Sequence, residues 1–220
     1  MSIDKRLAVC ADMVTGGFAA DIGTDHGYLP SFLIRSGRCR HAIAADINSA
    51  PLDAARRTAQ AEGTADRMTF ILSDGLARIP LDDVTDIICA GMGGELIARI
   101  ILEDERTKGI SIITQPMSRP HILRHELLSH GYSLDEERAV ISKGHIYSVM
   151  RWHYTGETFF DERDEYIGRL DPERETDRQY ILDLIQRMTA AACGMADSRP
   201  HEAERLRRII RDIGGTDIIP

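Results

Sequence analysis

Short apolar runs that alternate with helix-like segments are the feature that most constrains the fold of this chain. The runs fall at 18–22, 42–47, 68–72, 86–90 and 110–114. The early runs are continuous, without the alternation of apolar and polar residues typical of a half-exposed sheet. Continuous runs indicate strands that are buried on both faces of a parallel sheet. Helices are predicted at 29–36, 49–61, 95–102 and 120–130, which favours a doubly wound α/β fold.

Further helices and strands are predicted before and after this α/β core. A short leading helix is predicted over 4–15, and strands at 132–141 and 145–154 are close enough to pair as an antiparallel edge. We therefore expect a Rossmann-like, mostly parallel sheet in a domain spanning 1–156. Residues 157–220 are dense in charge and lack strand-like runs before their extreme end. Helices predicted at 173–196 and 201–213, separated by a break at 197–200, would form an antiparallel helical hairpin.

The turn after the first strand carries the first candidate site. Gly23 and Gly27 let the backbone pass close to a ligand, but Asp25 occupies the middle glycine position of the dinucleotide fingerprint. A carboxylate there would repel a pyrophosphate. It would suit the sulfonium and ammonium groups of S-adenosylmethionine (SAM), which carries no phosphate. A plain strand-to-helix turn is the alternative for the glycine spacing alone.

Polar or glycine-rich segments also follow the later strands. Asp46 ends the second strand and can accept hydrogen bonds from ribose hydroxyls, while Asp74 after the third could accept from an adenine amino group. The glycines of Ala90–Gly94 would let the cofactor's methionine end and a target base approach, and Gln115 could bind a base edge. Each segment alone is also explained as an ordinary turn, cap or solvated loop. Together they occupy the carboxyl ends of five strands, which favours a nucleoside-containing cofactor.

Bulk composition excludes several classes of protein. No apolar run reaches the length of a membrane span, and four scattered cysteines without a CxxC pair indicate free thiols, so we expect a cytoplasmic protein. His121, His125 and His130 lack an HExxH motif, and no metal is expected. The sequence contains neither GxSxG nor GxxxxGK[ST], which excludes the usual serine hydrolase and P-loop sites.

Charge argues mildly against a nucleic-acid partner, because the formal net charge is −8. A local basic face can still exist on an acidic protein. Two clusters of arginines are candidates for binding the phosphates of a nucleic acid. One consists of Arg35, Arg38 and Arg40, and the other of Arg205, Arg207, Arg208 and Arg211. For each cluster, an ordinary solvated helix face is the alternative.

Six segments together resemble the bacterial TrmK family of tRNA (adenine-N1)-methyltransferases, which act on adenine 22 of tRNA. They are residues 21–30 (DIGTDHGYLP), 73–76 (SDGL), 90–94 (AGMGG), 115–116 (QP), 126–132 (ELLSHGY) and 143–147 (KGHIY). The helical C-terminal segment also resembles that family's coiled-coil domain. The resemblance implies SAM as cofactor, tRNA as substrate, and a cofactor pocket formed by Gly23, Thr24, Asp25, Tyr28, Asp46, Ile47, Asp74, Gly75, Ala90, Gly91, Met92 and Gly93.

The candidates for contacting the target base are Asp25, His26, Tyr28 and Gln115. Tyr28 could stack on the base, and His26 or Asp25 could polarise the amino group or accept the proton released late in the reaction. Two alternatives stay open: a SAM enzyme acting on a small molecule, with the C-terminal helices serving oligomerisation, and a non-catalytic module that binds SAM or a nucleotide. A monomer or weak homodimer is expected.

Overall fold

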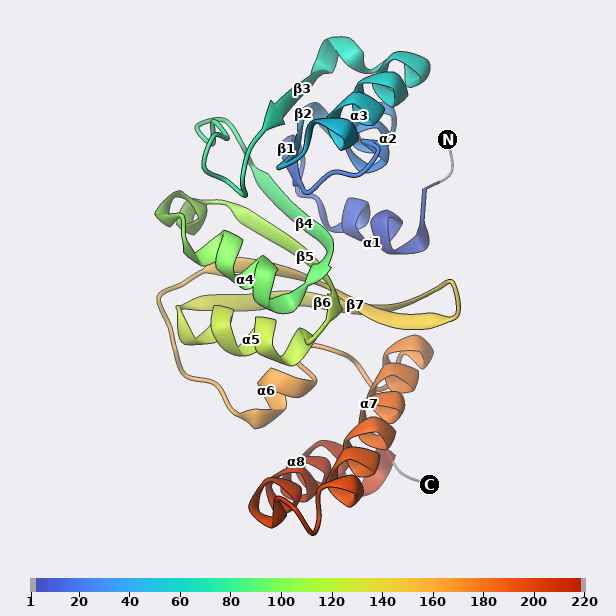
Figure 1. Cartoon of the computed structure of the whole chain (residues 1–220), viewed down its shortest axis with the longest axis vertical. Coiled ribbons are helices and arrows are strands. Elements are labelled where there is room, and N and C mark those ends of the chain that lie inside the picture. The colour runs from blue at the N-terminus through green and yellow to red at the C-terminus, as the bar shows by residue number, and fades with distance from the viewer. Residues whose placement is uncertain (1–2, 219–220) are drawn as a thin grey trace.

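One seven-stranded sheet organises the molecule, a computed structural model that describes residues 3–218, with side chains up to residue 214 (Figure 1). The strand order is β3-β2-β1-β4-β5-β7-β6, and the five strands from β3 to β5 are parallel. β7 is antiparallel to both of its neighbours. The strands are β1 (Gly17–Ile22), β2 (Cys39–Asp46), β3 (Met68–Leu72), β4 (Asp86–Gly93), β5 (Ser111–Ser118), β6 (Tyr132–Ser142) and β7 (His145–Tyr154). The predicted Rossmann-like sheet with an antiparallel edge is thus confirmed.

Helices cover both faces of this sheet (Figure 1). They are α1 (Lys5–Met13), α2 (Tyr28–Arg35), α3 (Ser49–Glu62), α4 (Gly94–Leu102) and α5 (Pro120–Ser129). Residues of α1, α2 and α3 form one apolar core with the strands, and residues of α4 and α5 form the other. Successive residues of β1 point into opposite cores, with Ala19 in the first and Ala20 in the second. Burial on both faces explains why the strand runs are continuously apolar.

Two strands extend three or four residues beyond their predicted carboxyl ends. β4 continues to Gly93 and β5 to Ser118, because the two strands stay paired beyond their apolar runs, from Ala90 opposite Gln115 to Gly93 opposite Ser118. The prediction that β4 ends at residue 90 and β5 at residue 114 was therefore wrong. Three short elements were not predicted: 3₁₀ turns at Ala65–Arg67 and Glu105–Gly109, and helix α6 (Glu162–Tyr166).

The C-terminal helices α7 (Glu175–Gly194) and α8 (Pro200–Ile218) pack on each other, as the predicted hairpin requires. Figure 1 shows α8 turning back along α7. Their apolar stripes meet in a third core that contains Ile185, Met188, Ile209 and Ile213. Ile167 from the connecting segment joins the same core, which ties the hairpin to the chain that precedes it.

A buried ion pair joins this C-terminal part to the sheet. Arg124 of α5 and Glu137 of β6 are both fully buried, with Nη2 and Oε1 2.5 Å apart. Arg124 Nη1 also donates to the carbonyls of Glu165 and Tyr166, at 2.9 and 3.1 Å. The division into domains 1–156 and 157–220 stays a prediction, and its residues 1–2 and 219–220 lie outside the described residues.

Candidate functional site

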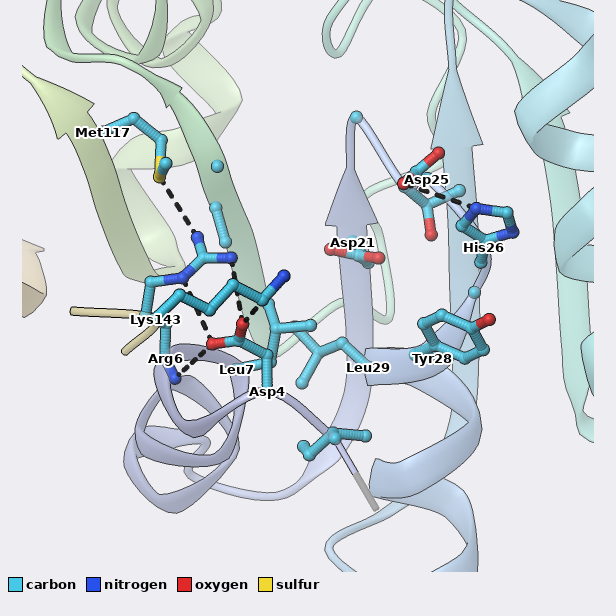
Figure 2. Close-up of a pocket in the computed structure, with 16 residues that line it drawn as sticks. Asp4, Arg6, Leu7, Asp21, Asp25, His26, Tyr28, Leu29, Met117 and Lys143 are labelled. Atoms are coloured by element: carbon cyan, nitrogen blue, oxygen red, sulfur yellow. Dashed lines mark hydrogen bonds and ion pairs between the residues drawn. The ribbon is translucent and has the colours of Figure 1, made fainter. Parts of the chain in front are cut away.

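A cavity of about 700 Å³ opens at the carboxyl ends of β1 and β4 (Figure 2). Residues 23–29, which run from the turn after β1 into α2, form one wall together with Asp21. Ala90 and Gly91 of β4 also line it, and the start of α1 contributes Asp4, Arg6 and Leu7. Met117 from β5 and Lys143 from the β6–β7 turn complete much of the opposite side. The edge of the sheet where ligands bind in doubly wound folds therefore carries a formed pocket.

The turn after β1 leaves the backbone of Gly23 open to close contact with neighbouring atoms. The backbone N–H groups of Gly23 and Thr24 both donate to the carbonyl of Ala45 at the end of β2, at 2.8 and 2.9 Å. Gly23 has φ +77°, and a Cβ at this position would lie 2.5 Å from Met92 Cε. A side chain here is thus disfavoured both by backbone conformation and by space. Met92 accordingly contacts the turn from β4, which brings two of the predicted segments together.

Asp21 gives the cavity a negative charge at its base. The residue ends β1 and is only 7% exposed. Burial raises the pKa of Asp21 to about 6, and the charge of Asp46 on the neighbouring strand adds to the shift. Asp21 is absent from the residues predicted to bind the cofactor. Its position at the end of a buried strand, directly before the glycine turn, is the signal that would have identified it.

Most of the residues predicted on the first turn line the cavity. Asp25 is 85% exposed and lies with Oδ2 3.5 Å from His26 Nε2. The rings of His26 and Tyr28 are stacked, with centroids 5.2 Å apart and planes inclined by 20°. Both rings are partly exposed, so a flat surface borders the cavity beside a carboxylate. Gly23, Thr24, Ala90 and Gly91, which were predicted to bind the cofactor, also lie on the wall of the cavity.

Other predicted residues lie beside the cavity and not on its described wall. Asp46 is the last residue of β2, the strand next to β1, and its Oδ1 accepts from the backbone N–H of Asn48 at 2.7 Å. Ile47 is 59% exposed. Asp74 and Gly75 line a separate hollow of about 310 Å³ against α4. Gly93 lies within β4, opposite Ser118.

Gln115, which was predicted to bind a base edge, is not among the described residues that line the cavity. Its side chain is fully buried, with Oε1 accepting from Arg6 Nη1 at 2.6 Å and Nε2 donating to the carbonyl of Pro116 at 2.9 Å. Arg6 lines the cavity at this point, although no sequence pattern had singled it out. Arg6 Nε also donates to Asp4 Oδ1 at 3.2 Å, and its guanidinium lies over the Tyr147 ring, 5.4 Å from the centroid.

A second hollow, of about 550 Å³, shares Met117 with the cavity. The tip of the β6–β7 hairpin lines one side of it, including His145 and Tyr147. Helix α7 lines the other with Gln179, Asp183 and Arg187. The two hollows are thus adjacent, and the second leads from the cavity towards the C-terminal helices.

Ion pairing within the chain engages most of the two arginine clusters. Arg35 pairs with Glu62 and Arg38 with Asp12, while Arg40 is exposed at the start of β2. In the C-terminal cluster, Arg205 and Arg208 bind Glu162 of α6, and Arg207 and Arg211 bind Glu204. These surface pairs are weak, so they reduce each cluster's positive potential without preventing phosphate binding.

The histidines show no sign of a metal site. Within residues 3–218, no group of three or more His, Cys, Asp or Glu side chains is arranged to hold a metal ion. His125 Nδ1 lies 3.0 Å from Glu165 Oε1, and the His121 ring stacks on Tyr166.

Among the described helices, none combines the length and the apolar character that crossing a membrane requires.

Comparison with known proteins identifies one family model, described as a methyltransferase domain, which matches residues 3–150. The chain is 32% identical over 153 residues to the tRNA (adenine(22)-N(1))-methyltransferase of Bacillus subtilis, a match covering 68% of this chain and 64% of that enzyme. It is therefore aligned with slightly less than two thirds of that relative. It is also 32% identical over 178 residues to a Mycoplasma pneumoniae protein provisionally named a tRNA methyltransferase, covering 77% of this chain and 81% of that protein.

A solved structure extends the similarity over nearly the whole chain. Streptococcus pneumoniae Sp1610, a provisionally assigned tRNA (m1A22) methyltransferase, was crystallised in complex with SAM. It superposes with a TM-score of 0.84 at 27% identity, covering 96% of this chain and 99% of that one. The superposed region includes the C-terminal helices as well as the sheet.

Proposed function

The chain belongs to the TrmK family of SAM-dependent methyltransferases, and we propose that it methylates N1 of the adenine at position 22 of tRNA. The observation that carries this proposal is the cavity where a close glycine turn meets a buried carboxylate. That combination fits a cationic, phosphate-free cofactor. Bound SAM in the Streptococcus pneumoniae relative supports the same cofactor here.

The residues around the cavity fit SAM. Met92 packs so closely on Gly23 that a Cβ there would lie 2.5 Å from Met92 Cε, whereas Gly91, at φ +83°, has open space around its Cβ position. Asp21 and the acidic turn complement the positive charges. We assign Asp46 and Ile47 to the ribose and Asp74 and Gly75 to the adenine, because β2 and β3 follow β1 in the sheet in that order. Thr24, Asp25, Tyr28, Ala90, Met92 and Gly93 complete the proposed pocket. When bound, SAM supplies the electrophilic methyl group.

The protein's own contribution to the reaction is mainly positioning. Adenine N1 carries a lone pair, so its attack needs no prior deprotonation, and holding N1 in line with the methyl group supplies the rate enhancement. The stacked pair of His26 and Tyr28 offers a face on which the target adenine can stack. Asp25 lies exposed beside this pair, 3.5 Å from His26, and one of these two residues would accept the proton that the amino group loses after transfer. Gln115 is buried behind Arg6, and we assign it a positioning role.

The target adenine must leave the tRNA stack to enter this cavity, at the cost of a few kcal/mol of unstacking. The second hollow, adjoining at Met117, provides a path for the nucleotides that flank the flipped base. Lys143 is 84% exposed and lies 3.9 Å from Asp4, and Arg187 is 60% exposed and paired with Asp183; these surface pairs are weak, so both cations remain available to RNA phosphates along that path. We therefore propose that tRNA lies across the β6–β7 hairpin and α7, which accounts for RNA binding by an acidic protein.

A methylation assay with two transcripts tests this function. Purified protein, radiolabelled SAM and a tRNA carrying adenine at position 22 should give a product that mass mapping locates as 1-methyladenine at that position. The same tRNA with guanine at position 22 is the matched control and should give none. Equal labelling of both transcripts would contradict the site assignment. SAM binding without any tRNA product would favour a small-molecule methyltransferase or a non-catalytic module.

Location and assembly follow from this role as further proposals. A tRNA-modifying enzyme with free thiols at Cys10, Cys39, Cys89 and Cys193 fits the reducing cytoplasm. We propose a monomer or weak homodimer, and light scattering at two protein concentrations would distinguish them.

A further inference from the structure

Helix α7 is anchored to the edge of the sheet through one buried carboxylate. Asp177, in the first turn of α7, is only 2% exposed. Its Oδ1 accepts from the backbone N–H of Ala139 in β6 at 2.7 Å, and its Oδ2 accepts from the backbone N–H of Asp171 at 3.1 Å. Figure 1 shows α7 beginning beside the β6–β7 hairpin and running away from the sheet. The carboxylate thus lies where the C-terminal helices meet the sheet.

The anchor satisfies a backbone group at the edge of the sheet. β6 is the last strand of the described sheet, so one side of its backbone faces no other strand. Backbone N–H groups on that side need another acceptor when water cannot reach them. Asp177 supplies this acceptor for Ala139, and a carboxylate binds an N–H group more strongly than a neutral carbonyl does. At this point, α7 therefore takes the place of a further strand.

The apolar contacts around this anchor do not fix the helix by themselves. Tyr180 and Ile181 of α7 are buried in the third core. Ala139 and Ile146 of the β6–β7 hairpin pack against that core. Apolar burial is non-directional, so these contacts tolerate small slides and tilts of the helix. A hydrogen bond depends on distance and angle, and the bond from Ala139 to Asp177 therefore defines one position for the start of α7.

The same helix forms one wall of the second hollow, through Gln179, Asp183 and Arg187. Arg187 follows Asp177 by ten positions, which is about 15 Å along the axis of an α-helix. A tilt of about 10° at the anchor would therefore move Arg187 by about 3 Å. The tip of the β6–β7 hairpin lines the other side of the hollow. The contact between Asp177 and the hairpin thus determines how far apart the two walls lie.

We infer that Asp177 is a positioning residue for the tRNA: it fixes the width of the second hollow and so selects which nucleotide reaches the cavity. The hollow adjoins the cavity at Met117, so a shift of one wall displaces an RNA strand held between them. Successive nucleotides of a stacked strand rise by about 3.4 Å, so a shift of about 3 Å is enough to present a neighbouring base. This inference rests on the proposed function, because it assumes that tRNA lies across α7.

A purely structural role for Asp177 predicts a different result. A variant that is merely less stable contains less folded enzyme, so its rates fall in proportion on all substrates and their ratio stays constant. Loss of positioning changes the ratio between two substrates that differ in the place of the adenine. It also raises the KM for tRNA while leaving the Kd for SAM unchanged.

Two tRNA transcripts measure this ratio. One carries adenine at position 22, and the other carries guanine there and adenine at position 23. With the full-length wild-type protein, kcat/KM should be far higher for the first transcript. Asp177→Ala should lower the ratio of the two values at least about tenfold, because a misplacement of about 1 Å can change a rate a hundredfold. Mass mapping should locate the methyl group of the second transcript at position 23.

Asp177→Asn is the conservative variant. Its amide oxygen can still accept from Ala139, but its NH₂ group cannot accept from Asp171, so the ratio should fall only in part. This variant also provides the measurement if Asp177→Ala fails to fold, which thermal unfolding detects.

Two controls separate position from stability. Glu175→Ala removes an exposed carboxylate from the same helical turn and should leave the ratio unchanged. Met188→Ala removes a buried side chain from the third core, so it should lower stability without changing the ratio.

A wild-type ratio in both Asp177 variants, or no product at position 23 in either, would overturn the inference. An equal fall of the ratio in Met188→Ala would overturn it as well. Failure of the wild-type protein to methylate the first transcript would instead overturn the proposed function, so the two failures are distinguishable.

Discussion

Arg6 Nη1 donates a 2.6 Å hydrogen bond to Gln115 Oε1 across 109 positions of sequence. The bond connects the first turn of α1 with the fully buried end of the β5 apolar run. It explains why a glutamine occupies an otherwise apolar position: the amide accepts from the arginine that lines the cavity. Gln115 thus acts on the site through Arg6.

Gln115→Leu tests this relationship. Removing the acceptor leaves a partly buried Arg6 donor without its partner, so we expect a loss of about 1–3 kcal/mol in the free energy of unfolding and a several-fold rise in the Kd for SAM. Denaturant titration and calorimetry measure the two effects. At saturating SAM and tRNA, kcat should change little. A fall of more than a hundredfold in kcat would instead indicate that Gln115 contacts the target base.

Gly23→Ala should abolish cofactor binding while leaving a folded protein. The new Cβ would lie 2.5 Å from Met92 Cε, and the φ of +77° is unfavourable for alanine by about 1 kcal/mol. Gly37→Ala is the matched control, because Gly37 has φ +73° with nothing within 4 Å of its Cβ position. Gly23→Ala should lose more stability than Gly37→Ala, because only its Cβ has to displace Met92. Loss of SAM binding by both, or by neither, would contradict a close approach of cofactor to Gly23.

The affinity for SAM should fall as the pH is lowered through about 6, where Asp21 takes up a proton and loses the charge that complements the cationic cofactor. Asp21→Asn should weaken SAM at pH 8 and remove the pH dependence. The exposed Asp12→Asn should retain the profile. Calorimetry between pH 5 and 8 gives the profile, and an unchanged one in Asp21→Asn would refute the assignment.

The same shift makes a prediction about the free protein. Asp21 has a pKa raised from 3.8 to about 6 by folding, so its contribution to stability is fully present below pH 3.8 and is lost as the pH rises through about 6. Removing the buried charge with Asp21→Asn should therefore stabilise the free protein at pH 8, by about 1–2 kcal/mol. Urea unfolding without cofactor measures this, and destabilisation at pH 8 would be inconsistent with it.

Arg124→Met should destabilise the protein by about 3–5 kcal/mol, because it leaves the Glu137 carboxylate buried and unpaired. The double variant Arg124→Met, Glu137→Leu should recover part of this loss. Arg199→Met is the control: its pair with Glu202 is exposed, and its loss should cost at most about 1 kcal/mol. Similar losses for Arg124→Met and Arg199→Met in urea unfolding would show that the buried pair contributes little.

Arg187→Ala should raise the KM for tRNA about threefold to tenfold and reduce its salt dependence by about one counterion, with SAM affinity unchanged. Arg178→Ala is matched to it, because Arg178 is exposed on the same helix but does not line the hollow beside Met117. Methylation rates over a range of salt concentrations provide the test. Equal effects of both substitutions on the KM for tRNA would contradict the proposal that the RNA runs through that hollow.

The sequence determined the sheet, its helices and the family. Strands buried on both faces are apolar at nearly every position, so their runs are visible without any knowledge of the fold. The turn at residues 23–27 marks the ligand edge because Gly23 and Gly27 adopt positive φ, a conformation that favours glycine. The strand ends were less predictable: β4 and β5 extend through Gly93 and Ser118 because they pair with each other, not because of their own residues.

Tertiary structure alone decided which polar groups meet. Arg6 is an ordinary cation in the first helix until α1 docks at the end of β5, where Gln115, Asp4 and Tyr147 hold it against the cavity. Arg124 and Glu137 likewise become a buried pair only when α5 packs on β6. Such contacts depend on burial and on distances between elements far apart in the chain. Local pattern carries no information about either, whereas it carries nearly all the information about which elements form.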